Sequence, residues 1–187
     1  GAAPASLADY MGIPLKESLP MVVGILHKHG LKDRVKIIAS GKLVTPADVA
    51  WALCMGADFC VSARGFMFAL GCVQSMKCHA DTCPTGVATQ DATRQRGLVP
   101  MEKAERVARF QRHTLHSFRE MVVAMGLDNP WQIEPGDISE RLNGAQSDSL
   151  DRLHGFLQPG ALLDSPESTP YAHAWAAARA ETFREAI

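Results

Sequence analysis

The sequence predicts an α/β fold with a parallel sheet, and three observations point to that fold class. Helical and strand-like segments alternate with short connections, which is typical of β–α–β units. Two short runs, 34–41 and 57–63, have the length expected of buried parallel strands. A strong helix start lies between them. Because two parallel strands need cover on both faces and further strands at their edges, we expect the chain to be part of a larger α/β body.

The helix between the two strands has the clearest boundaries in the chain. Thr45 is a favourable N-cap residue, Pro46 suits the first helical position, and Asp48 stands three residues after the cap. Gly56 is the glycine expected just after the helix C-terminus. These signals predict a helix that begins after Thr45 and ends before Gly56.

Three further helices are predicted around this unit. Apolar residues at helical spacing before the first strand predict a helix that starts at Pro20 and stops at Gly30. Another helix over 64–76 follows the second strand, and a long amphipathic helix covers 101–125. The pattern contains no internal repeat.

Less regular structure is predicted beyond residue 125. A loop follows the long helix, and Gly, Ser, Asp and Pro dominate 143–170, where we expect little order. An alanine-rich helix is expected from Tyr171 to Glu185.

Composition and charge exclude several function classes. The chain has 187 residues, 47% of them hydrophobic, which is enough for one domain core. Its net charge is −1 with mixed signs throughout, so neither a nucleic-acid partner nor an anionic membrane is expected. No apolar run reaches the roughly 18 residues of a membrane span. The five cysteines, without a visible secretory signal, indicate a reducing compartment, and the cytoplasm is the expected location.

The two predicted strands end in "ASGK" (39–42) and "SARG" (62–65), which together suggest a phosphate site. In α/β barrels the loops after the last two strands commonly bind phosphate through backbone N–H groups and a helix N-terminus. Gly41 would let the backbone approach, and Ser40 could donate its hydroxyl. The N–H groups of Ala63 and Arg64 would open the next helix, and Lys42 or Arg64 could neutralise charge. Each signal alone is more typical of an ordinary turn.

Three of the five cysteines lie within a dozen residues, with the spacing C-x5-C-x4-C-P at Cys72, Cys78 and Cys83. Soft thiolates gathered at one place indicate a metal site. Zinc would need a fourth ligand, for which His79 or Asp81 is available, although the usual C-x2–4-C spacing is missing. Three thiolates also suit a 3Fe–4S cluster, and the Cys-Pro ending matches a ferredoxin run. The alternative is that these are ordinary structural thiols. Cys54 and Cys60 fit apolar patterns and are expected in the core.

The motifs "ASGK", "GAD-x-C-x-x-AR" and "GC-x5-C-x4-CP-x-GVATQ", in this order, resemble the end of the FMN-binding central domain of the glutamate synthase family. The resemblance spans about 1–125, and the opening "GAAP" resembles the end of the family's glycine-rich loop. Residues 126–187 resemble only the short glutamate-synthase-like proteins. We therefore expect a barrel segment over 1–125 and a loop-rich, helical C-terminal extension over 126–187.

The resemblance implies the C-terminal part of a (β/α)8 TIM barrel, with its last two strands and helices. It implies FMN, with its phosphate at the two strand-end loops, and a 3Fe–4S cluster on Cys72, Cys78 and Cys83. Electrons would pass from the cluster to FMN, and 2-oxoglutarate and ammonia would yield L-glutamate. The implied partners are the remainder of the barrel, a source of ammonia such as glutamine, and an electron-donor subunit or ferredoxin.

Several alternatives stay open at the level of sequence. A complete TIM barrel takes about 250 residues, so the catalytic and 2-oxoglutarate-binding residues would lie outside this chain, which we expect to be inactive and poorly folded alone. An N-methylglutamate synthase subunit has the same motifs, and a non-catalytic iron–sulfur or structural module fits an incomplete barrel. His113 and His116, one turn apart on the long helix, are expected on a polar helix face.

Overall fold

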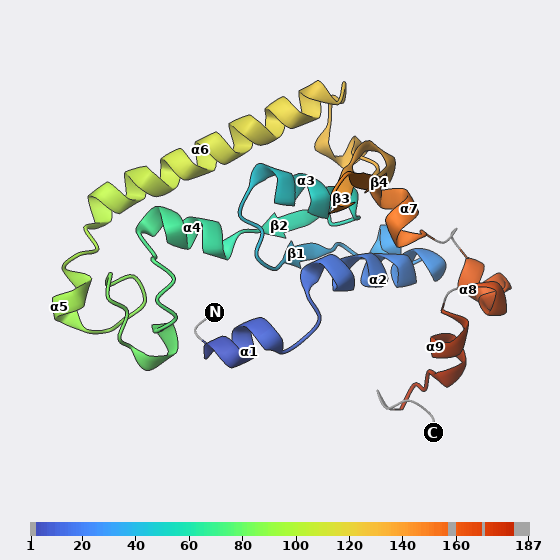
Figure 1. Cartoon of the computed structure of the whole chain (residues 1–187), viewed down its shortest axis with the longest axis horizontal. Helices are drawn as coiled ribbons and strands as arrows, with labels where there is room; N and C mark the ends of the chain where they lie inside the picture. Colours follow the sequence, from blue (N-terminus) through green and yellow to red (C-terminus); the bar gives the residue numbers. More distant parts are fainter. Residues whose placement is uncertain (1–2, 157–159, 170, 182–187) are drawn as a thin grey trace.

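A computed structural model of the chain describes residues 3–156, 160–169 and 171–181. At its centre is a parallel two-stranded sheet of β1 (Ile38–Ser40) and β2 (Phe59–Val61), in which Ser40 stands opposite Val61. Figure 1 shows these strands between the helices that precede and join them. The α/β class and the parallel pairing are therefore confirmed, and the rest of the barrel stays a prediction.

The helices flanking the sheet follow the predicted order. They are α2 (Leu15–Lys28), α3 (Pro46–Cys54), α4 (Ala63–Leu70) and α6 (Pro100–Ala124). In α3 the capping box is complete, because Thr45 accepts the N–H of Asp48 while the Asp48 carboxylate accepts the N–H of Thr45. The predicted boundaries of α3 and α6 are confirmed to within two residues.

Two predicted helix boundaries are wrong. The helix α2 begins at Leu15 rather than at Pro20, because the carbonyl of Pro14 accepts the N–H groups of Glu17 and Ser18 and starts the first turn earlier. At the other side of the sheet, α4 ends at Leu70, because Gly71 adopts a left-handed conformation with φ +107° and turns the chain away. The residues up to Met76 therefore belong to a loop.

The expectation of little order over 143–170 is wrong where the structure describes that region. A hairpin of β3 (Ser139–Asn143) and β4 (Gln146–Ser149) leads into α7 (Leu150–His154). Two short helices follow, α8 (Ala161–Asp164) and α9 (Ala172–Ala177). The predicted final helix is thus shorter than Tyr171 to Glu185, and residues 182–185 lie outside the described part.

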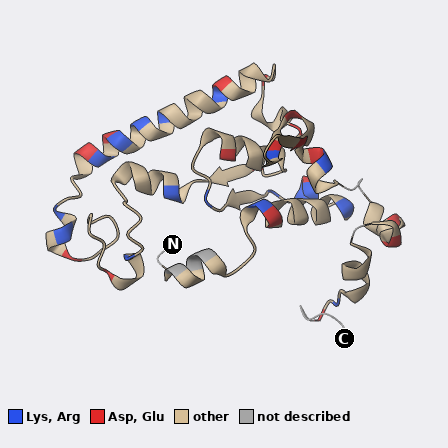
Figure 2. Cartoon of the chain, in the orientation of Figure 1, with Lys and Arg blue, Asp and Glu red and all other residues tan. Residues whose placement is uncertain are grey.

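The remaining elements are short. They are α1 (Ala5–Tyr10), α5 (Ala92–Gln95), and the 3-10 turns η1 (Lys32–Arg34), η2 (Cys78–Ala80), η3 (Pro130–Gln132), η4 (Pro135–Asp137) and η5 (Pro166–Ser168). No described helix is both long enough and apolar enough to cross a membrane. Figure 2 shows Lys and Arg spaced along α6, at the edge of the molecule.

One hydrophobic core joins both halves of the chain. It gathers buried residues of α2, β1, α3 and α6 together with Ile133 and Leu150 from the C-terminal extension. Cys54 is buried in it and Cys60 packs against it, as predicted. The sheet is covered unevenly, because Ile38, Phe59 and Val61 remain about half exposed.

Asp58 links the N-terminal ends of β1 and β2 through hydrogen bonds and ion pairs. Its carboxylate accepts the N–H of Ile37 at 2.8 Å and the ammonium groups of Lys32 at 2.9 Å and Lys36 at 3.1 Å. Burial alone would raise the pKa of Asp58, but these donors outweigh it and lower the pKa to about 2. A carboxyl whose pKa falls on folding stabilises the fold above its ordinary pKa of 3.8, and this contribution is lost as the pH falls toward 2.

We expect Asp58→Asn to cost about 2 kcal/mol of unfolding free energy at pH 7. The gap between wild type and variant should narrow between pH 5 and pH 2, because the wild type loses the same interaction on protonation. Urea unfolding of the protein at several pH values measures both effects. Asp33→Asn is the matched control, since Asp33 is an exposed carboxylate in η1, close in sequence to Lys32. A constant gap across this pH range would contradict the assignment.

Candidate functional site

The carboxyl ends of β1 and β2 lie side by side and are tied together. The parallel register brings Ser40 next to Val61, so the loops that follow both strands leave the same edge. The hydroxyl of Ser62, just after β2, donates a 2.6 Å hydrogen bond to the carbonyl of Leu43, in the loop after β1. The two loops that the sequence singled out are therefore adjacent.

The loop after β1 has a backbone that depends on glycine. A Cβ at Gly41 would come within 2.8 Å of the Leu15 Cβ, so α2 leaves room for no side chain there. Lys42 follows with a left-handed φ of +57°. Ser40, Gly41 and Lys42 are all exposed at the strand end. This loop can present its hydroxyl, backbone and ammonium groups to a ligand.

The first turn of α4 offers backbone donors beside that loop. Ala63 and Arg64 are its first two residues, and Ser62 is its N-cap. The Ser62 hydroxyl donates to Leu43, and its oxygen makes no cap hydrogen bond to the helix. Among the described residues the opening N–H groups therefore have no side-chain cap, and uncapped N–H groups at a helix N-terminus can bind anions. These residues fit the phosphate of a flavin nucleotide.

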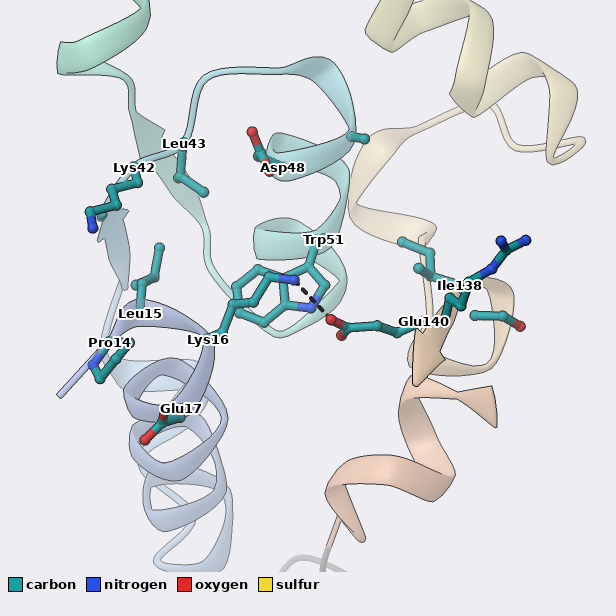
Figure 3. A pocket seen from close by; sticks show the side chains of 14 residues that line it. Pro14, Leu15, Lys16, Glu17, Lys42, Leu43, Asp48, Trp51, Ile138 and Glu140 are labelled. Atoms are coloured by element: carbon teal, nitrogen blue, oxygen red, sulfur yellow. Dashed lines mark hydrogen bonds and ion pairs between the residues drawn. The ribbon is translucent and has the colours of Figure 1, made fainter. Parts of the chain in front are cut away.

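A pocket of about 630 Å³ extends from this loop along the flank of α2 and α3 to the β3–β4 hairpin. Figure 3 shows Lys16 and Glu140 meeting next to the ring of Trp51, and the ammonium–carboxylate distance is 2.9 Å. The Trp51 ring is buried, and its N–H has no acceptor among the residues that the structure describes. The hairpin is thereby attached to the strand-end region. Sequence reasoning missed this contact, because Lys16 and Glu140 stand 124 residues apart.

The three clustered cysteines all lie in the segment that follows α4. Cys72 comes directly after Gly71, Cys78 opens η2, and Cys83 is buried in the loop beyond. All are free thiols. The loop is organised around Asp81, whose carbonyl accepts the Thr89 hydroxyl at 2.6 Å.

The described residues contain no group of three or more His, Cys, Asp and Glu side chains that could hold a single metal ion. The zinc alternative with His79 or Asp81 is therefore unsupported there. In an iron–sulfur cluster each thiolate binds a different iron, so the three sulfurs need not converge on one point.

Two of the three sulfurs take part in hydrogen bonds, which cluster thiolates also do. Cys72 Sγ accepts the N–H of Gln74 at 3.5 Å. The pKa of the Cys83 thiol is lowered to about 7, and the largest cause is the Thr85 hydroxyl, which lies 3.4 Å from the sulfur. Burial raises this pKa, but the backbone N–H groups of Ala88, Thr85 and Val87 lower it further. Such donors stabilise a buried thiolate, and the donor set fits an iron–sulfur cluster.

Replacing Thr85 with valine should raise the pKa of Cys83. Loss of one neutral hydrogen bond, about 1 kcal/mol, corresponds to a rise of about 0.7 pKa unit. The rate of iodoacetamide alkylation at Cys83, followed against pH by peptide mass spectrometry in cluster-free protein, measures it. Thr82→Val is the matched control, because Thr82 is exposed and adjacent to Cys83. Equal pKa values in both variants would show that the hydroxyl does not act on the sulfur.

The two histidines of α6 lie where the sequence predicts. His113 and His116 are exposed, and His116 Nε2 is 3.5 Å from a carboxylate oxygen of Glu120 one turn along the helix. They belong to a polar helix face.

Comparison with known proteins decides the family. A family model described as the conserved region in glutamate synthase matches residues 1–128. The chain belongs to the glutamate synthase family. It is 38% identical over 158 residues to a glutamate synthase large subunit-like protein of Bacillus subtilis, covering 84% of this chain and 30% of that protein. It is 35% identical over 129 residues to the archaeal glutamate synthase [NADPH] of Methanocaldococcus jannaschii, covering 69% of this chain and 25% of that one.

A third member of the glutamate synthase family is much longer. The glutamate synthase [NADPH] large chain of Bacillus subtilis is 33% identical over 126 residues, which are 67% of this chain and 8% of that one. The chain thus spans less than a third of the length of each of these relatives. The family match ends near residue 128, close to the end of α6, while the first relative also matches part of the extension.

Proposed function

We propose that the chain is part of an FMN and iron–sulfur oxidoreductase of the glutamate synthase type, which reductively aminates 2-oxoglutarate to L-glutamate. The observation that carries this proposal is the pair of adjacent strand-end loops joined by the Ser62–Leu43 hydrogen bond, with the cysteine segment following the helix that starts there. Membership of the glutamate synthase family supports it.

In this proposal the strand-end residues hold the flavin phosphate. Ser40 donates its hydroxyl, and Gly41 keeps the backbone close to the ligand. Ala63 and Arg64 donate their N–H groups from the first turn of α4, and Lys42 and Arg64 balance the charge of the phosphate. The absence of a side chain on Gly41 is needed for α2 to pack there, so the same glycine serves the fold and the site.

The cysteine segment holds the second cofactor. Cys72, Cys78 and Cys83 are the proposed ligands of a 3Fe–4S cluster, and hydrogen bonds from Gln74 and Thr85 stabilise two of the three thiolates. When bound, the cluster supplies one-electron transfer and the flavin supplies reduction of the substrate. The donor of those electrons is proposed to be a further subunit or a ferredoxin.

Three apolar side chains of the sheet are exposed, and their exposure supports the proposal of a larger barrel. Ile38, Phe59 and Val61 point away from the core of this chain and are about half exposed. In a closed barrel such strand residues are covered by neighbouring strands and by the barrel interior. We propose that the missing strands, which would also supply the 2-oxoglutarate site, cover these residues.

The proposal is tested by the visible and EPR spectra of the assembled enzyme that contains this chain. We expect flavin bands with a broad cluster shoulder, and an EPR signal of an oxidised 3Fe–4S cluster. The signal should be lost in Cys78→Ala and kept in Cys60→Ala, whose sulfur packs against the core. A colourless wild-type protein would overturn the proposal. Assays with 2-oxoglutarate and either ammonia or methylamine then identify the amine that the enzyme adds.

A further inference from the structure

Two cations of α6 lie over the C-terminal end of α4, next to Gly71, the residue that precedes the first cysteine of the segment. A Cβ built on Gly71 would lie 3.4 Å from Lys103 Nζ and 4.0 Å from a guanidinium nitrogen of Arg106. Gly71 is the C-cap of α4 and directly precedes Cys72. The absence of a side chain at Gly71 therefore lets two positive charges approach the backbone at the start of the cysteine segment.

This approach is fixed by the packing of α6 on α4. The rings of Phe66 and Phe110 meet edge to face, with centroids 5.1 Å apart and planes at 80°. A Cβ on Gly65 would come within 2.7 Å of the Phe110 ring, so a second glycine of α4 receives that ring. Phe110 lies one helical turn beyond Arg106, so its packing fixes the position along α4 at which Lys103 and Arg106 approach that helix. Figure 1 shows the two helices side by side where the chain enters the cysteine segment.

Among the described residues, Lys103 and Arg106 differ in their ion pairing from two other cations of α6 that lie further along the helix. Within the described part of the chain no carboxylate pairs with Lys103 or Arg106. Further along the same helix, Arg109 and Arg112 share the carboxylate of Glu105, at 3.1 and 3.2 Å. The surroundings are also basic, because residues 72–112 contain seven Lys and Arg against four Asp and Glu in a chain of net charge −1 (Figure 2).

We propose that Lys103 and Arg106 raise the reduction potential of the cluster held by the cysteine segment, by placing positive charge next to Gly71, the residue that precedes Cys72. The inference rests on the proposed function, since it requires the cluster. A cluster bound by three thiolates is anionic and gains a further negative charge on reduction, so nearby cations stabilise its reduced form more than its oxidised form. Lys103 and Arg106 thus favour electron entry without touching the iron.

A purely structural role for the same cations would act through the C-terminus of α4. Positive charge at a helix C-terminus stabilises the helix through its dipole. Such a role would change the thermal stability of the protein and leave the reduction potential where it was. The potential of the cluster therefore separates the two roles.

The test is an EPR-monitored redox titration of the assembled enzyme in wild type, Lys103→Met, Arg106→Met and the double variant. We expect each single substitution to lower the equilibrium constant for one-electron reduction about threefold to tenfold. At 59 mV for a tenfold change this is a shift of about 30 to 60 mV to lower potential. Arg112→Met is the matched control, because its cation is already paired with Glu105, and it should leave the potential unchanged.

A second measurement guards against variants that fail to assemble. Raising the ionic strength screens exposed charges, so the wild-type potential should fall with added salt, and this dependence should be the same in Arg112→Met. Lys103→Arg, which keeps the charge, should retain the wild-type potential. The inference would be overturned if wild type, Lys103→Met and Arg106→Met had the same reduction potential. It would also be overturned if the wild-type potential did not respond to salt. A wild-type enzyme without a cluster signal would instead overturn the proposed function.

Discussion

Replacing Leu150 with alanine is expected to destabilise the hydrophobic core: the free energy needed to unfold the core should fall by about 3 to 5 kcal/mol. Leu150 is the first residue of α7 and is fully buried, with 0% of its surface exposed. It belongs to the same core as residues of α2 and α3, so the cavity would open among residues 1–125 as well as in the extension. Its N–H also donates to the carbonyl of Ile138, which leads into the hairpin.

Native-state hydrogen exchange of the protein, read by mass spectrometry, measures this effect. We expect faster exchange in α3 and β1 as well as in α7, because all three elements share the core. Leu163→Ala is the matched control, since Leu163 also belongs to the extension and is 59% exposed. If only the amides of α7 lost protection, the extension would be an independent layer.

The C-terminal extension thus packs into the fold of residues 1–125. The indole N–H of Trp131 donates to the carbonyl of Asp58 at 3.2 Å, immediately before β2. Ile133 is buried in the common core, and Glu140 pairs with Lys16 of α2. The boundary near residue 126 stays a prediction, but residues on its two sides pack together.

The sequence allowed accurate prediction where a local interaction decides the structure. The capping box of α3 depends on Thr45 and Asp48, three residues apart, and both can be recognised without tertiary information. The parallel pairing of β1 and β2 follows from the helix between them, because such a crossover returns the chain in the same direction.

The hairpin of the extension was missed although a local signal is present. Gly144 and Ala145 form the two-residue turn between Asn143 and its partner Gln146, and Gly144, with a φ of +48°, is the glycine expected at the first turn position. The surrounding strands are polar and mostly exposed, so the alternation of apolar and polar residues that usually reveals a strand is weak. The polar composition of this region outweighed the turn signal.

The sequence singles out the residues of the candidate site but not their surroundings. The spacing of Cys72, Cys78 and Cys83 was sufficient to single them out, because three of only five cysteines lie within a dozen residues. The acidity of the Cys83 thiol depends on how the loop folds back to bring the Thr85 hydroxyl and backbone N–H groups to the sulfur. Such loop geometry is set by contacts with distant elements, which a linear pattern does not reveal.

Gly86 holds the fold of the cysteine segment, and Gly86→Ala should disrupt it. Gly86 has a φ of +75°, and an added Cβ would overlap the carbonyl of Arg94, with the Gln95 Cα only 3.0 Å away. Left-handed strain and a clash with backbone atoms together should cost about 3 kcal/mol or more. The turn closed by the Gly86 N–H to the Cys83 carbonyl would open, and the N–H groups of the following residues would move from the sulfur.

Gly97→Ala is the matched control for this substitution, because the same backbone passes close to both glycines. A Cβ on Gly97 would make ordinary contacts, at 3.6 Å to the Arg94 carbonyl oxygen and 3.8 Å to that of Thr85. We expect Gly86→Ala to speed hydrogen exchange over 83–95. The same variant should raise the pKa of the Cys83 thiol from about 7 toward its ordinary value of 9.0, whereas Gly97→Ala should change neither. Since the thiolate is the form that ligates iron, the same variant should bind less iron at neutral pH. Equal exchange and equal thiol acidity in the two variants would mean that the Gly86 turn does not hold Cys83 in place.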